Sequence, residues 1–431
     1  MSAVTPKLKR DIGYLVASFL VLNGIIGAGI FALPGELADQ AGLYGPWLIL
    51  LCGVLIISVA WTFAAIASYF KTSGGPVTYA SAAFGPAAGF QVGWFLYVGR
   101  GTSLAANTNV LFNYIAYFWD GVDSDISKVV LFIIIIGGLT VVNIMGLKGA
   151  MKAISLFSLM KAIPILVLIL IGLPYVSPAG ILPGDFPVID DMGTLVLLIL
   201  YAFVGFECVL FTSGETKEPK KTLPRALFTT VVAITVVYFL IQLIYVNTVT
   251  EVSKDTPLIE LGRILFGEYG ATIIIVTALC SIMGTATSIL LTAPRLTFSM
   301  AEQGMLPSWF SVVHEKYNTP ANSVLFLGAI GLFLGITGTF VYLALASALA
   351  RIIAYIICIC SLPAIRRQAD PETLKDALKL PGGYLIPALG LLVCAVAVVI
   401  SPLQSWLYLS GFIILGGGLY FINSRLKKGQ S

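Results

Sequence analysis

The chain has 431 residues, of which 58% are hydrophobic and only 11% are charged, and its mean hydropathy is +0.96. Soluble domains carry roughly 25% charged residues, so this composition excludes a water-soluble globular protein. The formal net charge of +4 gives no reason to expect a nucleic acid partner, because the basic residues follow a membrane pattern described below.

Twelve apolar segments divide the sequence. A spanning helix needs about 20 apolar residues to cross a bilayer core about 30 Å thick. No clear small-residue cleavage site follows the first segment, so we expect it to remain as a helix. We predict an all-α polytopic membrane protein in which residues 1–431 form a single membrane transport domain with twelve transmembrane helices. The segments are 13–36, 44–70, 86–118, 129–146, 150–175, 192–212, 225–248, 270–299, 321–338, 341–364, 384–401 and 403–423.

The distribution of basic residues predicts the orientation of these helices. With the N-terminus in the cytoplasm, the lysines and arginines between segments gather in the cytoplasmic loops. The outer loops contain only Lys128, Lys254 and Arg263. Positive charge resists translocation. We therefore expect a multi-pass protein of the cytoplasmic (inner) membrane with both termini cytoplasmic.

The first apolar segment contains a cluster of glycines. Gly24, Gly27 and Gly29 fall within six residues. Close helix packing is one explanation, because small residues let backbones approach each other. The other is an unwound stretch whose free N–H groups, at the positive end of the following half-helix, bind a carboxylate. The candidate substrate-binding residues are Ile26, Gly27, Ala28 and Gly29.

The sixth segment contains a second candidate break, at Gly205, with Glu207 directly after it. The candidate substrate-binding residues here are Tyr201, Phe203, Val204 and Gly205. Segments one and six lie five apart, which fits a five-plus-five inverted repeat whose halves each begin with a broken helix. The repeats are then residues 11–175 (helices 1–5) and 191–367 (helices 6–10), and residues 384–424 form accessory helices 11–12.

Several stretches occur in the order of a known family. They are Gly24–Phe31, Phe203–Glu207, Glu218–Ala226, Pro294–Pro307 and Asn318–Pro320. Together they make the chain, from about residue 8 to 370, resemble the amino acid–polyamine–organocation superfamily of transporters. The resemblance implies five plus five helices in inverted repeat, a small amine-bearing substrate at the midplane, and secondary active transport by alternating access.

Four charged residues lie at mid-membrane depth in the apolar segments, where each costs about 3 kcal/mol on insertion scales. In the superfamily, a lysine at the place of Lys161 substitutes for a sodium ion and bridges helices one and eight. Lys161 is then either the carrier of a coupled proton or a fixed cation, and a structural ion pair is the alternative. Ser281 and Thr285 share one helix face, which is expected to look toward Lys161. Because Lys161 fills the cation position, the sequence favours a proton over sodium. The four residues are Arg100, Lys161, Glu207 and Arg351.

The other buried charges have several interpretations. Glu207 holds the substrate ammonium through water, senses pH, or latches helix six to its neighbours. Arg100 and Arg351 pair with Glu207 or with backbone carbonyls, or Arg100 contacts an acidic substrate. In relatives an aromatic residue near Tyr201 and Phe203 caps the substrate, and core packing is the alternative for both rings.

The sequence favours proton-coupled symport of neutral or zwitterionic amino acids. Exchange of amino acids or amines, and transport of polyamines or cationic amino acids, remain alternatives. Three positive and one negative buried charges suit an anionic or zwitterionic substrate better than a dication. The six cysteines lie in apolar segments and the single histidine, His314, lies in a loop, so we expect no cofactor, no metal site and no enzyme activity. A homodimer through helices 11–12 remains open.

Overall fold

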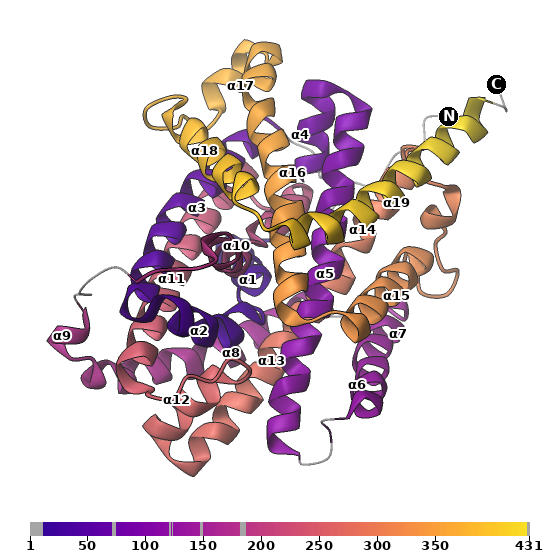
Figure 1. Cartoon of the computed structure of the whole chain (residues 1–431). Coiled ribbons are helices and arrows are strands. Elements are labelled where there is room, and N and C mark those ends of the chain that lie inside the picture. Colours follow the sequence, from indigo (N-terminus) through magenta and orange to yellow (C-terminus); the bar gives the residue numbers. More distant parts are fainter. Residues whose placement is uncertain are drawn as a thin grey trace.

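The computed structural model describes residues 12–70, 75–119, 122, 124–146, 150–181 and 187–428. This described part of the chain is helical and contains no strand. Two long helices, α5 (Pro86–Phe118) and α16 (Phe340–Gln368), pack side by side through the centre of the bundle (Figure 1). The other helices surround this pair.

The surrounding α-helices differ widely in length. They are α1 (Tyr14–Ile25), α2 (Gly29–Ala41), α3 (Gly45–Ala67), α4 (Gly75–Phe84), α6 (Asp125–Phe132), α7 (Gly138–Ile144), α8 (Ala150–Gly172), α9 (Pro178–Ile181), α10 (Met192–Phe203), α11 (Pro219–Thr248), α12 (Pro257–Phe266), α13 (Glu268–Thr292), α14 (Pro294–Glu302), α15 (Ala321–Thr337), α17 (Pro371–Asp376), α18 (Leu385–Val399) and α19 (Leu403–Lys428). Short 3₁₀ or π turns join them at η1 (Gly42–Tyr44), η2 (Ile133–Gly137), η3 (Leu173–Tyr175), η4 (Phe206–Glu215) and η5 (Ser308–Ser311).

The helices confirm an all-helical, multi-pass membrane protein. By length and composition, seven helical stretches of the described chain qualify as membrane spans, or eight if α18 and α19, which meet at 100°, count as one. The apolar helices α1 and α15 are shorter, with 12 and 17 residues. The count of twelve spans and the inverted repeat remain predictions.

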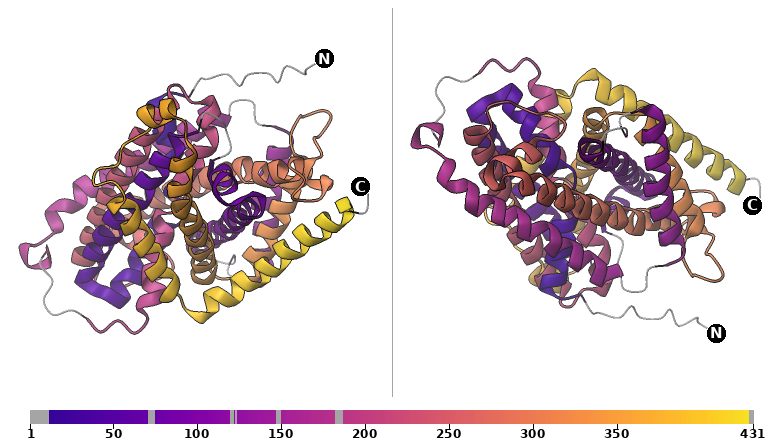
Figure 2. Two further views of the ribbon diagram at one scale, coloured as in Figure 1. Left: turned by 90° about the horizontal axis from the view of Figure 1, so that it is seen from above. Right: turned by 90° about the horizontal axis from the view of Figure 1, so that it is seen from below.

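The outer surface of the bundle suits lipid. Helix α19 runs along one edge of the molecule in both views of Figure 2. Its side chain Ile414 is 75% exposed, and Leu170 on α8 is 69% exposed. A soluble protein shows such apolar side chains singly, whereas here they recur along whole helices, as a bilayer requires.

Both predicted helix breaks are present. The first helix stops at Ile25 and resumes as α2 at Gly29, and Ile26 has an extended backbone with ψ of 94°. Helix α10 stops at Phe203, and Gly205 adopts a left-handed backbone with φ of +114°. Glycine adopts that conformation without the steric penalty that a side chain incurs, so the second break depends on glycine.

The two breaks touch each other through their backbones. A Cβ atom added to Gly24 would lie 2.5 Å from the Gly205 carbonyl oxygen, and one added to Gly205 would lie 2.1 Å from that of Gly24. Real Cβ atoms essentially never come this close to another heavy atom. Close packing and unwinding, which the sequence left as alternatives, therefore occur together.

Replacing Gly205 with alanine is expected to destabilise the protein by about 1–3 kcal/mol, because the Cβ atom meets backbone and φ is left-handed. Thermal unfolding of the purified protein in detergent measures this. The matched control is Gly417→Ala in α19, where an added Cβ meets nothing within 4 Å. An equal melting temperature for both variants would show that the two breaks do not need their close contact.

Candidate substrate site

A small polar cavity lies where the two breaks meet. Its volume is about 10 Å³, room for about one water molecule. An amino acid does not fit, so this conformation is closed around the site, and binding requires the surrounding helices to separate. The lining residues come from the first break and from α5, α10, α13 and α16: Gly24, Ile25, Gly27, Ala28, Gly29, Ser103, Asn107, Tyr201, Val204, Thr285 and Arg351.

The first break presents unbonded backbone donors. Ile26 N–H donates to the Leu22 carbonyl at 2.8 Å, and Ala28 N–H donates to Asn107 Oδ1 at 2.8 Å. The N–H groups of Gly27 and Gly29 have no hydrogen-bond partner among the described residues. Both residues line the cavity, at the N-terminal end of α2, where the helix dipole favours a negative charge. The arrangement can bind a carboxylate.

Asn107 on α5 is a site residue that the sequence analysis missed. Besides accepting from Ala28 N–H, its amide donates to the Ser103 carbonyl at 2.7 Å and to the Tyr201 hydroxyl at 3.3 Å. It therefore ties the first break to α5 and to the end of α10. The available signal was an amide in the middle of a membrane-spanning helix, since polar groups at that depth need partners.

Replacing Asn107 with alanine is expected to raise the KM for transport about tenfold, because it leaves the buried Ala28 N–H unpaired and loosens the first break. Initial uptake rates over a range of substrate concentrations measure this. Asn109→Ala is the matched control, because within the described part of the chain the Asn109 side chain bonds to the Ala105 and Gly335 carbonyls and not to the first break. A KM that changes equally in both variants would argue against a role for Asn107 at the break.

Lys161 bridges the first break to α13, as the resemblance implied. Its fully buried Nζ donates to the Ile26 carbonyl at 2.6 Å, to Thr285 Oγ1 at 3.3 Å and to the Ser281 carbonyl at 3.4 Å. All three partners are neutral oxygens, and within the described residues no carboxylate lies at ion-pair distance from Lys161. Lys161 is therefore a cation bound by neutral oxygen atoms. This geometry does not support the alternative in which Lys161 forms a structural ion pair.

Glu207 lies at the centre of a buried polar cluster. Its Oε2 accepts from the Tyr355 hydroxyl at 2.6 Å and from Gly205 N–H at 3.0 Å, and its Oε1 accepts from Arg100 Nη2 at 3.3 Å. Arg351 Nε lies 3.9 Å from the same Oε1. The expected pairing of Arg100 is therefore present. One carboxylate holds the second break against α5 and α16.

The structure separates the candidate residues into those at the cavity and those behind it. Tyr201, Val204 and Thr285 line the cavity. Phe203 packs on Tyr238 of α11, with ring centroids 5.4 Å apart, and does not line the cavity. Gly27, Ala28, Gly29 and Arg351 line it as well. The other candidates lie outside the lining: Ile26, Lys161, Gly205, Ser281, Glu207 and Arg100.

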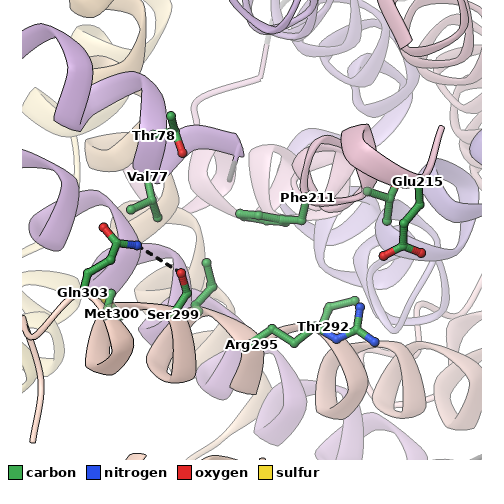
Figure 3. A pocket seen from close by; sticks show the side chains of 11 residues that line it. Val77, Thr78, Phe211, Glu215, Thr292, Arg295, Ser299, Met300 and Gln303 are labelled. Carbon is green, nitrogen blue, oxygen red and sulfur yellow. Dashed lines mark hydrogen bonds between the residues drawn. The ribbon is translucent and has the colours of Figure 1, made fainter. Parts of the chain in front are cut away.

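A second, larger pocket lies beside the end of η4. It has a volume of about 260 Å³ and shares no lining residue with the small cavity. Figure 3 shows Phe211 from η4 reaching into it, with Glu215 and Arg295 at one side. Both side chains line the space, and among the ion pairs of the described residues none joins Glu215 to Arg295.

A closed polar cavity between two helix breaks, inside a bundle of apolar helices, is the arrangement of a membrane transporter. Comparison with known protein families agrees. Residues 12–412 match the family model described as amino acid permease, and the chain belongs to this family. The match confirms the resemblance to the amino acid–polyamine–organocation superfamily.

Characterised relatives align over most of the chain. The serine/threonine exchanger SteT of Bacillus subtilis is 30% identical over 397 residues, which cover 89% of each chain. The branched-chain amino acid permease BcaP of Bacillus subtilis is 24% identical over 97% of this chain and 94% of its own. The human Asc-type amino acid transporter 1 is 27% identical over 88% of this chain and 76% of its own. These relatives are named for transport and not for catalysis, so amino acid transport is the general function.

Proposed function

We propose that the protein is a secondary active transporter that takes up zwitterionic α-amino acids across the cytoplasmic membrane by alternating access, coupled to protons. The observation that carries the proposal is the pair of unbonded N–H groups at Gly27 and Gly29, in a closed cavity at the start of α2. They are suited to the substrate α-carboxylate. The backbone carbonyls at the C-terminal end of α10, where Val204 leaves the helix, can accept hydrogen bonds from the substrate α-ammonium.

The charges near the site bear on the substrate class. Arg100, Lys161 and Arg351 are positive and Glu207 is negative, which disfavours polyamines and cationic amino acids. Two of the relatives are named for neutral amino acids, one for serine and threonine and one for branched-chain amino acids. The side chain is considered separately below.

The two cavities suggest how access alternates. In the proposed topology both termini and the basic loop after η4 are cytoplasmic, which makes the pocket at Glu215 and Arg295 a cytoplasmic vestibule. The small cavity is closed from it in this conformation. Release then requires the first break and η4 to move apart from α13 and α14. We retain twelve spans, the repeats 11–175 and 191–367, and accessory helices in 384–424 as part of the proposal.

Lys161 is the proposed coupling residue. With a proton, its ammonium binds the Ile26 carbonyl and α13, as observed. Without the proton it loses its charge and one donor, which weakens the bridge between the first break and α13. Because Nζ itself binds these neutral oxygen atoms, a sodium ion is not needed. The exchanger among the relatives favours a second candidate, amino acid exchange with Lys161 as a fixed cation.

Reconstitution in liposomes tests the proposal. The purified protein is offered a mixture of amino acids and amines, and accumulated species are identified by mass spectrometry with and without an inward proton gradient. Accumulation of α-amino acids only with the gradient supports symport. Uptake that needs internal amino acid and ignores the gradient supports exchange. Accumulation of amines without any amino acid would contradict both.

A further inference from the structure

Arg351 is the only charged side chain among the described residues that line the small cavity. It projects from α16 and is 2% exposed. Its Nη2 donates to the Gly99 carbonyl at 3.1 Å, whereas its Nε makes no hydrogen bond. A buried donor without a partner is costly. Since the hydrogen bond to Gly99 does not saturate the guanidinium and Arg351 lines the cavity, an acceptor that enters the cavity can bind it.

Glu207 does not fully neutralise Arg351. Its Oε1 accepts a hydrogen bond from Arg100 at 3.3 Å, and Arg351 Nε lies farther away at 3.9 Å. Two guanidinium groups therefore share one carboxylate. Lys161 adds a further positive charge with neutral partners only. A negative charge brought by the substrate reduces this imbalance in a region where uncompensated charge is expensive.

The side chains next to Arg351 are polar. The Tyr201 hydroxyl lies 3.4 Å from Ser103 Oγ and 3.3 Å from Asn107 Nδ2, and all three residues line the same cavity. The donors available to an α-carboxylate belong to the first break, whereas Arg351 belongs to α16. A substrate that satisfies both elements carries two acceptor groups, one of them on its side chain.

We infer that the substrate is an acidic amino acid, with its side-chain carboxylate on Arg351 and its α-carboxylate on the N–H groups of Gly27 and Gly29. A guanidinium can donate two parallel hydrogen bonds to a carboxylate, and the charge strengthens both. This inference rests on the proposed function and narrows the substrate side chain that it left open. In this arrangement, the Gly99 carbonyl and the Glu207 carboxylate contact Arg351 outside the cavity and hold its guanidinium in position.

Isosteric substrate pairs test the inference. Uptake rates of aspartate and asparagine, and of glutamate and glutamine, are compared in proteoliposomes at equal concentration. We expect the acid of each pair to be taken up about tenfold or more faster than its amide, because only the acid is charged and fully accepts from Arg351. Arg351→Gln is expected to level or reverse this ratio. Arg351→Lys, which keeps the charge without the planar fork, is expected to lower it several-fold and serves if Arg351→Gln does not fold.

Arg100→Gln is the matched control. Like Arg351→Gln, it removes one guanidinium from the surroundings of Glu207, but Arg100 does not line the cavity. The preference for acids is therefore expected to persist. Faster uptake of the amides by the unaltered protein overturns the inference and leaves amino acid transport intact. If the ratio of acid to amide uptake falls equally in Arg100→Gln and Arg351→Gln, the overall positive charge selects the substrate, and the role of Arg351 is overturned. Failure to take up any amino acid is a failure of the proposed function itself.

Discussion

Replacing Lys161 with glutamine is expected to reduce gradient-driven uptake at least ~100-fold, since charge-assisted hydrogen bonds contribute about 1.5–3 kcal/mol each. The ammonium donates to three oxygens, on the first break and on α13. Glutamine supplies two donors and no charge. Uptake of labelled amino acid into proteoliposomes, with an imposed proton gradient, measures the loss.

The same variant separates the two candidate roles of Lys161. If Lys161 carries the coupled proton, Lys161→Gln loses gradient-driven uptake but retains counterflow exchange of labelled for unlabelled amino acid. If it is a fixed cation that holds the first break, both activities are lost. Lys220→Gln is the control, because Lys220 forms an ion pair with Asp376 at the surface, at 3.3 Å. Gradient-driven uptake by Lys161→Gln that equals the unaltered protein would rule out both roles.

Replacing Glu207 with glutamine is expected to destabilise the folded protein by about 3–5 kcal/mol, because removing one partner leaves buried charge uncompensated. Two guanidinium groups, from Arg100 and Arg351, then face a neutral amide. Glutamine also changes the partner of the Tyr355 hydroxyl and of Gly205 N–H. Thermal unfolding in detergent, with the yield of monodisperse protein, measures the loss.

Two comparisons make this result specific. Glu260→Gln removes a carboxylate from a partly exposed pair with Arg263 at 3.7 Å, and we expect a change of about 0–1 kcal/mol. Combining Glu207→Gln with Arg100→Gln removes one positive charge together with the negative one, and we expect it to recover part of the lost stability. A double variant no more stable than Glu207→Gln would indicate that Glu207 stabilises the protein through Gly205 and Tyr355 rather than through the arginines.

The helix breaks were predictable from sequence because Gly24, Gly27 and Gly29, and Gly205 followed by the charged Glu207, lie in segments five apart. The position of Lys161 was predictable for a similar reason, since a charge at that depth needs oxygen partners. Asn107 was not found, because α5 also carries Asn109 and Asn113, and the sequence does not show which of these amides faces the first break. The Ala28 N–H can donate to Asn107 because the break at Ile26 leaves this N–H without a helical hydrogen bond.

Other features depend on tertiary geometry that local sequence does not encode. For Phe203 the sequence left substrate capping and core packing open, and its ring packs on Tyr238 of α11. The sharing of Glu207 between Arg100 and Arg351 depends on how α5, η4 and α16 meet. The sequence predicts twelve spans, whereas seven or eight helical stretches of the described chain pass a length and composition test, because breaks and bends divide some apolar segments into shorter helices.

Besides the contact of the two breaks, an isolated β-bridge between Ile12 and Thr216 joins the two broken helices. Ile12 N–H donates to the Glu215 carbonyl at 3.0 Å, and Lys217 N–H donates to the Ile12 carbonyl at 2.8 Å. The first helix is thus held to η4 at its beginning by these bonds and at its break by the contact of Gly24 with Gly205. Because both bonds at Ile12 are made by main-chain atoms, an alanine scan would leave them in place, and this connection would go unseen in any survey that alters only side chains.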